Sequence, residues 1–174
     1  MEKLIGRTAE LKLIKVHPDG TGALKKNGPQ AIGKCRAGWS TKIHLVAANA
    51  TCALSFSLSP GQAGDAPAGR ELLKAWKKPA TANHLIMDRA YEGDETRQLA
   101  LDLGLTPVVP PKSNRITPWE YDKALYKKRN EVERLFRRLK GFRRIFSRFE
   151  KLDVMLTGFI HFVLNRFDDN GFTG

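Results

Sequence analysis

Apolar and polar residues follow one another in short periodic blocks, and the first half of the chain predicts strands followed by a helix. Residues 11–17 alternate apolar and basic side chains, as a half-buried strand does. A loop rich in glycine and proline is expected over 17–34. Strands over 40–48 and 52–59 are separated by a turn-like segment and predict a hairpin. Apolar residues at helical spacing predict a helix over 65–76.

The second half of the chain continues with alternating strands and helices. Residues 84–88, HLIMD, form an apolar run that ends in an acid, the pattern of a buried strand that delivers a carboxylate at its C-terminal edge. A helix over 92–103 and a strand over 106–110 follow. A basic helix is predicted over 126–140, and an apolar helix over 151–167 is expected to pack beside it. This order predicts an α/β domain with a mixed sheet covered by helices.

The predicted helix over 126–140 carries the chemistry that stands out most. At 3.6 residues per turn, Glu133 lies inside a cationic stripe that covers about 80° of arc. An apolar face beside the stripe would anchor the helix, so its charged face can line a cleft. The pattern suggests phosphate handling around a metal ligand, although a solvated helix with an ordinary ion pair would also produce it. The stripe consists of Tyr126, Arg129, Glu133, Arg137 and Lys140, and the apolar face of Val132, Leu135, Phe136 and Leu139.

The charge of the chain favours a polyanionic partner. Its 30 Lys and Arg against 18 Asp and Glu give a net charge of +12. The segment 112–151 holds 14 basic and 5 acidic residues and so supplies +9 of this excess. Nucleic acid is the partner that such a stripe fits, although a ribosomal or membrane-surface protein has a similar balance. There is no apolar run of about 18 residues and no signal-peptide core, so we expect a cytoplasmic protein that does not span a membrane.

The spacing of particular residues distinguishes between these classes of protein. The helix reads Y-(2)-R-(3)-E-(6)-K, the signature of bacterial insertion-sequence transposases with a DDE-type catalytic domain, and the chain resembles this family over about residues 11–167. Four further segments stand in the order that the family has them. They are GWSTKIHLVA, SLSPGQAGDAP, MDRAYEGDETRQL and PVVPPKSNR.

The resemblance implies a fold, an activity and a set of residues. The implied fold is ribonuclease-H-like, with a mixed five-stranded sheet flanked by helices and a basic C-terminal helix that carries the last catalytic acid. It occupies 11–174, and 1–10 match nothing in the family. The implied activity is cleavage and transfer of DNA strands with two Mg²⁺ or Mn²⁺ ions. Partners would be transposon ends, target DNA and further copies of the chain, in the bacterial cytoplasm at the nucleoid. The implied DNA-binding residues are Tyr126, Arg129, Arg137, Lys140, Arg143 and Arg144.

By the same resemblance, Asp88 is the second catalytic acid and metal ligand and Glu133 is the third. Alone, Asp88 would be an exposed acid paired with Arg89, and Asp65 is best explained as a helix N-cap. The family's first Asp stands seven residues before a His that closes D-S-T-x-x-[KR]-x-H, and counting back from His17 leads to Glu10.

The residue at position 10 departs from the family pattern. Glutamate can bind a metal, but its extra methylene displaces the carboxylate by more than the ~0.5 Å that catalysis tolerates. Leu11-Lys12 also replaces the family's Ser-Thr pair. We therefore expect an impaired transposase domain, a fragment or degenerate reading frame without the usual N-terminal region. The alternatives are a DNA-binding protein without catalysis that competes or oligomerises with an intact transposase, and a metal-dependent nuclease of the same fold.

Overall fold

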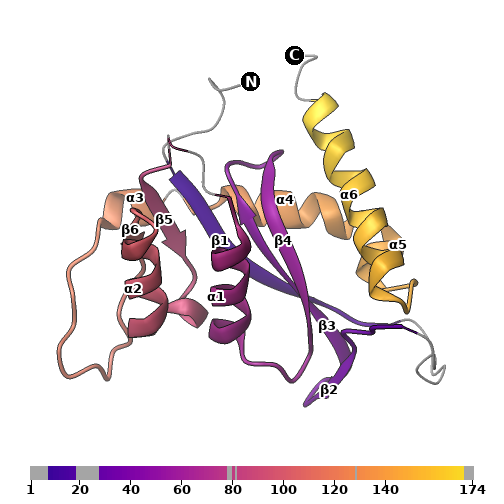
Figure 1. Ribbon diagram of the computed structural model, residues 1–174, viewed down its shortest axis with the longest axis horizontal. Coiled ribbons are helices and arrows are strands. Elements are labelled where there is room, and N and C mark those ends of the chain that lie inside the picture. The colour runs from indigo at the N-terminus through magenta and orange to yellow at the C-terminus, as the bar shows by residue number, and fades with distance from the viewer. Residues whose placement is uncertain (1–7, 19–27, 78–79, 81, 128, 171–174) are drawn as a thin grey trace.

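A mixed β-sheet forms the centre of the protein (Figure 1). The computed structural model describes residues 8–18, 28–77, 80, 82–127 and 129–170. The strands are β1 (Thr8–Val16), β2 (Gly33–Cys35), β3 (Gly38–Ala47), β4 (Ala53–Pro60), β5 (His84–Met87) and β6 (Thr106–Val108). The predictions over 40–48, 52–59, 84–88 and 106–110 are confirmed, and β1 begins three residues before the predicted strand.

The sheet is antiparallel on one side of β1 and parallel on the other. β1 pairs antiparallel with β3 and parallel with β5, and β6 continues the parallel side. On the antiparallel side, β3 pairs with β4 along most of its length and with β2 at its start. Among the residues that the structure describes, the sheet therefore has six strands and not the expected five. β2 overlaps the end of the expected loop over 17–34 and was not predicted, because its three residues are too few to show a period. Residues 19–27 of that loop lie outside the described part of the chain.

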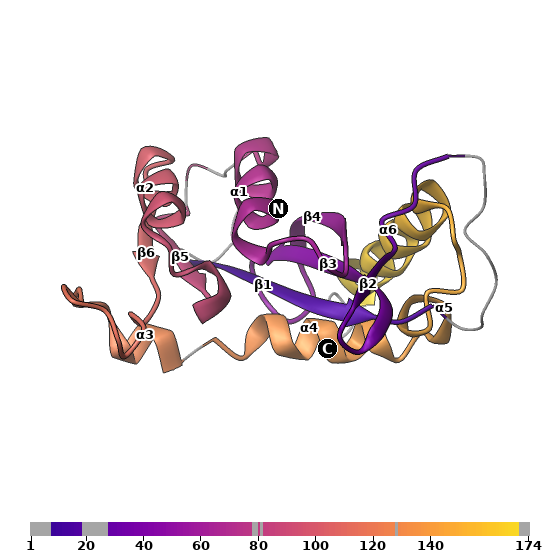
Figure 2. The same ribbon diagram turned by 90° about the horizontal axis from the view of Figure 1, so that it is seen from below.

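Helices cover both faces of the sheet (Figure 2). α1 (Asp65–Ala75) and α2 (Asp94–Asp102) lie on one face, and α4 (Glu131–Lys140) lies on the other. The remaining helices are the 3-10 turn η2 (Arg89–Tyr91), α3 (Lys123–Lys127), α5 (Arg143–Phe146) and α6 (Asp153–Asn170). The helices predicted over 65–76, 92–103 and 151–167 are confirmed within a few residues, and α5 was not predicted.

β1 is covered on both faces, and this corrects the prediction of a half-buried strand. Leu11 packs in the core cluster beneath α1 and α2, whereas Ile14 and Val16 pack in the cluster beneath α4 and α6. Side chains alternate between the faces of a strand, so those of Glu10 and Lys12 point to the α4 side together with Ile14. Two charged residues thus enter a layer that the pattern of β1 alone would assign to solvent.

The predicted continuous helix over 126–140 is wrong, because the chain forms two helices here. α3 ends at Lys127, Arg129 and Asn130 form a turn, and residue 128 is outside the described residues. Asn130 is a poor residue for a helix interior, and it is the N-cap of α4, although its side chain makes no capping hydrogen bond. The amide N–H of Val132, in the first turn of α4, donates to the Glu10 carboxylate from β1. Tertiary contacts therefore set where α4 begins.

The expected packing of the last helix beside the Glu133 helix is confirmed. Val132, Leu135, Phe136 and Leu139 of α4 are buried in one cluster with Ile160 and other apolar residues of α6. Within the described residues, every helix is too short or too polar to cross a bilayer.

Candidate functional site

Asp88 and Glu133 are brought together through the side chain of Lys12. Asp88 follows β5 directly, and its backbone N–H donates to the Leu11 carbonyl at 3.3 Å. Glu133 lies in the first turn of α4. The Lys12 ammonium donates to the Glu133 carboxylate, and its Nζ lies 3.8 Å from Asp88 Oδ2. The sheet and α4 thus bring the two acids that the resemblance implies to one ammonium group.

Strand register explains why Lys12, and not Glu10, reaches the acids. Glu10 is paired with Ile86 and Leu11 with Met87, so the next residue on each strand is Lys12 and Asp88. Glu10 points to the same face as Lys12 but lies two residues back along β1. At about 3.3 Å per residue in a parallel strand, this step is roughly 6.6 Å.

The Glu133 carboxylate is held ionised by its neighbours. The hydrogen bond from Lys12 makes the largest contribution to lowering the Glu133 pKa below its ordinary value, and the charges of Arg129 and Arg137 lower it further. Asp88 Oδ1 accepts a hydrogen bond from the Arg89 backbone N–H at 2.7 Å and so caps η2. Both carboxylates therefore accept hydrogen bonds, Glu133 from the Lys12 ammonium and Asp88 from the backbone next to it in the chain.

Glu10 has different surroundings. It is only 6% exposed, and its Oε2 accepts the hydrogen bond from the Val132 amide at 3.2 Å. Desolvation raises the pKa of Glu10 to about 7 against this hydrogen bond, which lowers it. At neutral pH the side chain is therefore close to half protonated, and its visible contact is with the N-terminus of α4.

The divalent-metal site that the resemblance implies does not fit these residues as they stand. Mg²⁺ is usually bound by one or two carboxylates together with water and substrate phosphate oxygens. Here Asp88 and Glu133 already share the Lys12 ammonium, and the Glu10 carboxylate is engaged with the backbone of α4. Among the described residues, no group of three His, Cys, Asp or Glu side chains is placed to hold a metal ion.

An open pocket beside the acids is lined by cations. Its walls come from β1 and α4, and its charged residues are Lys12, Glu133, Arg137 and Lys140. Arg137 and Lys140 are exposed on α4. Three cations surrounding one carboxylate leave a positive surface that fits phosphate groups.

Tyr126 and Arg129 lie near this site although α3 and α4 are separate. Arg129 donates a hydrogen bond to the Tyr126 hydroxyl, and its guanidinium lies 4.5 Å from the Tyr126 ring centroid. Burial raises the Tyr126 pKa, and the charge of Asp88 adds to this effect. Arg129 and Asp88 line the same small cavity. The residues of the Y-R-E-K signature therefore lie near one another through tertiary packing, and not on the single helix face that was predicted.

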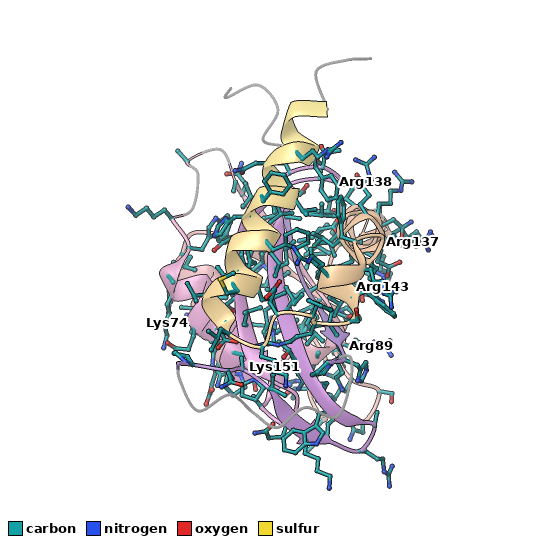
Figure 3. The ribbon with its side chains drawn as sticks, turned by 90° about the vertical axis from the view of Figure 1, so that its right-hand side faces the viewer. Lys74, Arg89, Arg137, Arg138, Arg143 and Lys151 are labelled. Atoms are coloured by element: carbon teal, nitrogen blue, oxygen red, sulfur yellow. The ribbon has the colours of Figure 1, made fainter. Side chains whose placement is uncertain are left out.

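The two arginines of α5 differ in their surroundings. Arg143 lies along one side of the protein with Arg89, Arg137 and Arg138 (Figure 3). Arg144 Nη2 lies 3.5 Å from Glu150, and its guanidinium stacks near the rings of Phe149 and Phe159. A role in DNA binding stays a prediction for both, and the contacts of Arg144 favour a structural role.

Sequence reasoning missed Lys12 as a member of the site. The signal that could have found it is a lysine standing where the family has a threonine, two residues after the presumed first acid. Whether the Lys12 side chain points into the site or into solvent depends on whether a helix covers that face of β1, which the pattern of β1 alone does not show.

Comparison with known proteins shows the family of the chain. The model of the family described as "Transposase DDE domain" matches residues 12–118. A protein of Brucella ovis, provisionally described as the transposase for insertion sequence element IS6501, is 34% identical over 123 residues, which are 70% of this chain and 92% of that protein. DDE transposase domains generally use divalent metal ions.

Two solved structures show distant likeness. A piggyBac transposase synaptic complex with hairpin DNA has a TM-score of 0.42 and 17% identity, over 64% of this chain and 24% of that chain. A Mos1 transposase paired-end complex with the left transposon end has a TM-score of 0.38 and 12% identity, over 96% of this chain and 55% of that chain.

Proposed function

The chain belongs to the family of transposases with a DDE domain, and on that premise we propose that it binds DNA along α4 and is impaired in metal-dependent strand cleavage and transfer. The fold we propose is ribonuclease-H-like. The order β4-β3-β1-β5-β6, with β3 antiparallel to its neighbours and β1, β5 and β6 parallel, supports it. In this arrangement Asp88 directly follows β5, and Glu133 lies on α4, the helix that covers β1.

Binding of DNA is supported by the charge and placement of side chains on α4. Arg137 and Lys140 are exposed on the wall of the open pocket, and Arg143 lies on the same side of the protein in Figure 3. Phosphate contacts by such residues provide affinity without sequence preference. Transposon ends as the preferred DNA, and assembly of several copies on DNA, are the parts of this proposal that follow from the resemblance.

Impairment of the chemistry is supported by one observation above all, the contact of Lys12 with both acids. Divalent ions, when bound to a complete DDE site, would activate the nucleophile and stabilise the leaving oxygen. Here the carboxylates already have a counter-ion, and Glu10 is both displaced along β1 and bound to Val132. The residues present can hold DNA phosphates, but they lack the free acids that the cleavage needs.

DNA binding is tested by fluorescence anisotropy with a labelled duplex over a range of salt concentrations. We expect the double variant Arg137→Ala and Lys140→Ala to weaken binding at low salt and to make the slope of log K against log salt shallower by about 1.8, since each lost phosphate contact is worth about 0.9. Lys74→Ala is the matched control, because Lys74 is exposed on α1 and lies on the opposite side in Figure 3. Equal slopes in the three proteins would contradict binding along α4.

Impairment is tested by nicking of supercoiled plasmid with Mg²⁺ or Mn²⁺, comparing the chain with its Glu133→Gln variant. We expect both proteins to bind the plasmid and neither to nick it above background. Metal-dependent nicking by the unmodified chain that disappears in Glu133→Gln would show a working site and overturn the proposed impairment. Binding without nicking supports a protein that competes with an intact transposase for its DNA.

A further inference from the structure

Lys12 takes a position that in a metal-dependent site belongs to a cation. Its Nζ contacts one oxygen of Glu133 and lies 3.8 Å from an oxygen of Asp88, so one positive charge bridges carboxylates from two separate elements. The side chain is only 22% exposed, and it points inward because β1 alternates and α4 covers this face. The ammonium is thus held by the fold and is not a freely moving surface group.

We propose that Lys12 acts as an internal replacement for the divalent ion and closes the Asp88–Glu133 pair to metal. The proposal rests on the proposed function and adds the residue that excludes the metal. An ammonium group within 4 Å of a carboxylate competes with a metal ion in two ways: it supplies hydrogen bonds to the oxygen lone pairs, and it repels a second cation.

The surroundings of Lys12 explain why the ammonium stays in place. Glu133 faces it from the first turn of α4, and Asp88 faces it from the end of β5. Lys12 lines both the small cavity, where Arg129 is its neighbour, and the open pocket, where Arg137 is. These two arginines add to the positive potential that an entering metal ion would meet. The same arrangement keeps the pocket favourable for a DNA phosphate.

The test measures Mn²⁺ binding to the full chain without DNA, by the loss of the free Mn²⁺ signal in electron paramagnetic resonance. Lys12→Met removes the ammonium and keeps a side chain of similar length. We expect the chain itself to show no binding that depends on Glu133, and Lys12→Met to bind at least tenfold more tightly than the chain. The gain should disappear when Glu133→Gln is added to Lys12→Met. Lys15→Met is the matched control, since Lys15 is exposed on the same strand and should leave binding unchanged.

Two outcomes would overturn the proposal. One is Mn²⁺ binding by the unmodified chain that is lost in Glu133→Gln, because the ammonium would then not exclude the ion. The other is a folded Lys12→Met that binds no more Mn²⁺ than Lys15→Met. If Lys12→Met does not fold, Lys12→Gln is measured in its place, because Gln keeps N–H donors for the carboxylates and removes the charge. The comparison of the chain with Glu133→Gln needs neither variant, and Mn²⁺ binding lost in Glu133→Gln would still overturn the proposal.

DNA binding measured on the same proteins without metal keeps this test separate from the proposed function. Failure of the chain to bind DNA would contradict the proposed function and would leave the Mn²⁺ comparison intact. Failure of the Mn²⁺ comparison would reject the role of Lys12 and leave DNA binding along α4 untouched.

Discussion

Replacing Glu10 with Gln should stabilise the protein above neutral pH. Burial raises the pKa of Glu10 from 4.5 to about 7, so the folded protein binds this proton more tightly than the unfolded chain. The stability that this group contributes is therefore complete below about pH 4.5 and is lost as the pH rises toward 7. A difference of about 2.5 pH units corresponds to about 3 kcal/mol. Gln keeps an oxygen for the Val132 amide and carries no charge.

The measurement is urea unfolding of the protein and of Glu10→Gln at pH 5, 6, 7 and 8. The variant should gain less than about 1 kcal/mol at pH 5 and about 3 kcal/mol at pH 8. Burial lowers the pKa of His44 to about 4, so its contribution has the opposite sign and is lost as the pH falls below about 6.5. That contribution is present in both proteins and cancels in their difference.

The control for this experiment is Glu120→Gln, because Glu120 is exposed and its replacement should leave the pH dependence unchanged. A difference between the protein and Glu10→Gln that stays flat from pH 5 to pH 8 would refute the reasoning. A difference of opposite sign, with the variant losing stability as the pH rises, would mean that Glu10 is held ionised in the folded protein. That result would favour the role of an anionic ligand for Glu10.

Three further substitutions test charge pairing and packing in the fold by urea unfolding. Asp65→Asn should lower the free energy of unfolding by about 2 kcal/mol, because it leaves the ammonium of Lys42, a residue only 5% exposed, without its carboxylate. A loss below about 0.5 kcal/mol would show that water solvates the Lys42 ammonium in place of the carboxylate. Gly69→Ala should give a net destabilisation of about 1 kcal/mol, because the added Cβ would lie 2.4 Å from a ring carbon of Tyr91. This clash outweighs the higher helix propensity of Ala, which is worth about 1 kcal/mol in the opposite direction. A gain in stability would show that the Tyr91 ring moves aside. Leu139→Ala should cost about 3 kcal/mol as a fully buried leucine of α4, and a loss near 1 would mean that α6 collapses into the cavity.

Local periodicity was sufficient to predict most elements. The hairpin of β3 and β4, the helix α1 and the short strand before Asp88 are each specified by residues close together in sequence. The expected N-cap at Asp65 is wrong, because Gly64 is the N-cap and Asp65 is turned toward Lys42 in the first turn. That choice depends on a lysine from β3, which the local sequence around α1 does not contain.

The sequence by itself determined the family, the basic character of the segment 112–151 and the two acids, Asp88 and Glu133, that meet at the site. These properties depend on residue types at fixed spacings, so they can be recognised without knowledge of the fold. Only the tertiary structure decided that Lys12 is level with Asp88 and that Glu10 binds the start of α4. The register of β1 with β5 and the packing of α4 over β1 determine both placements. These contacts join segments about 80 to 120 residues apart.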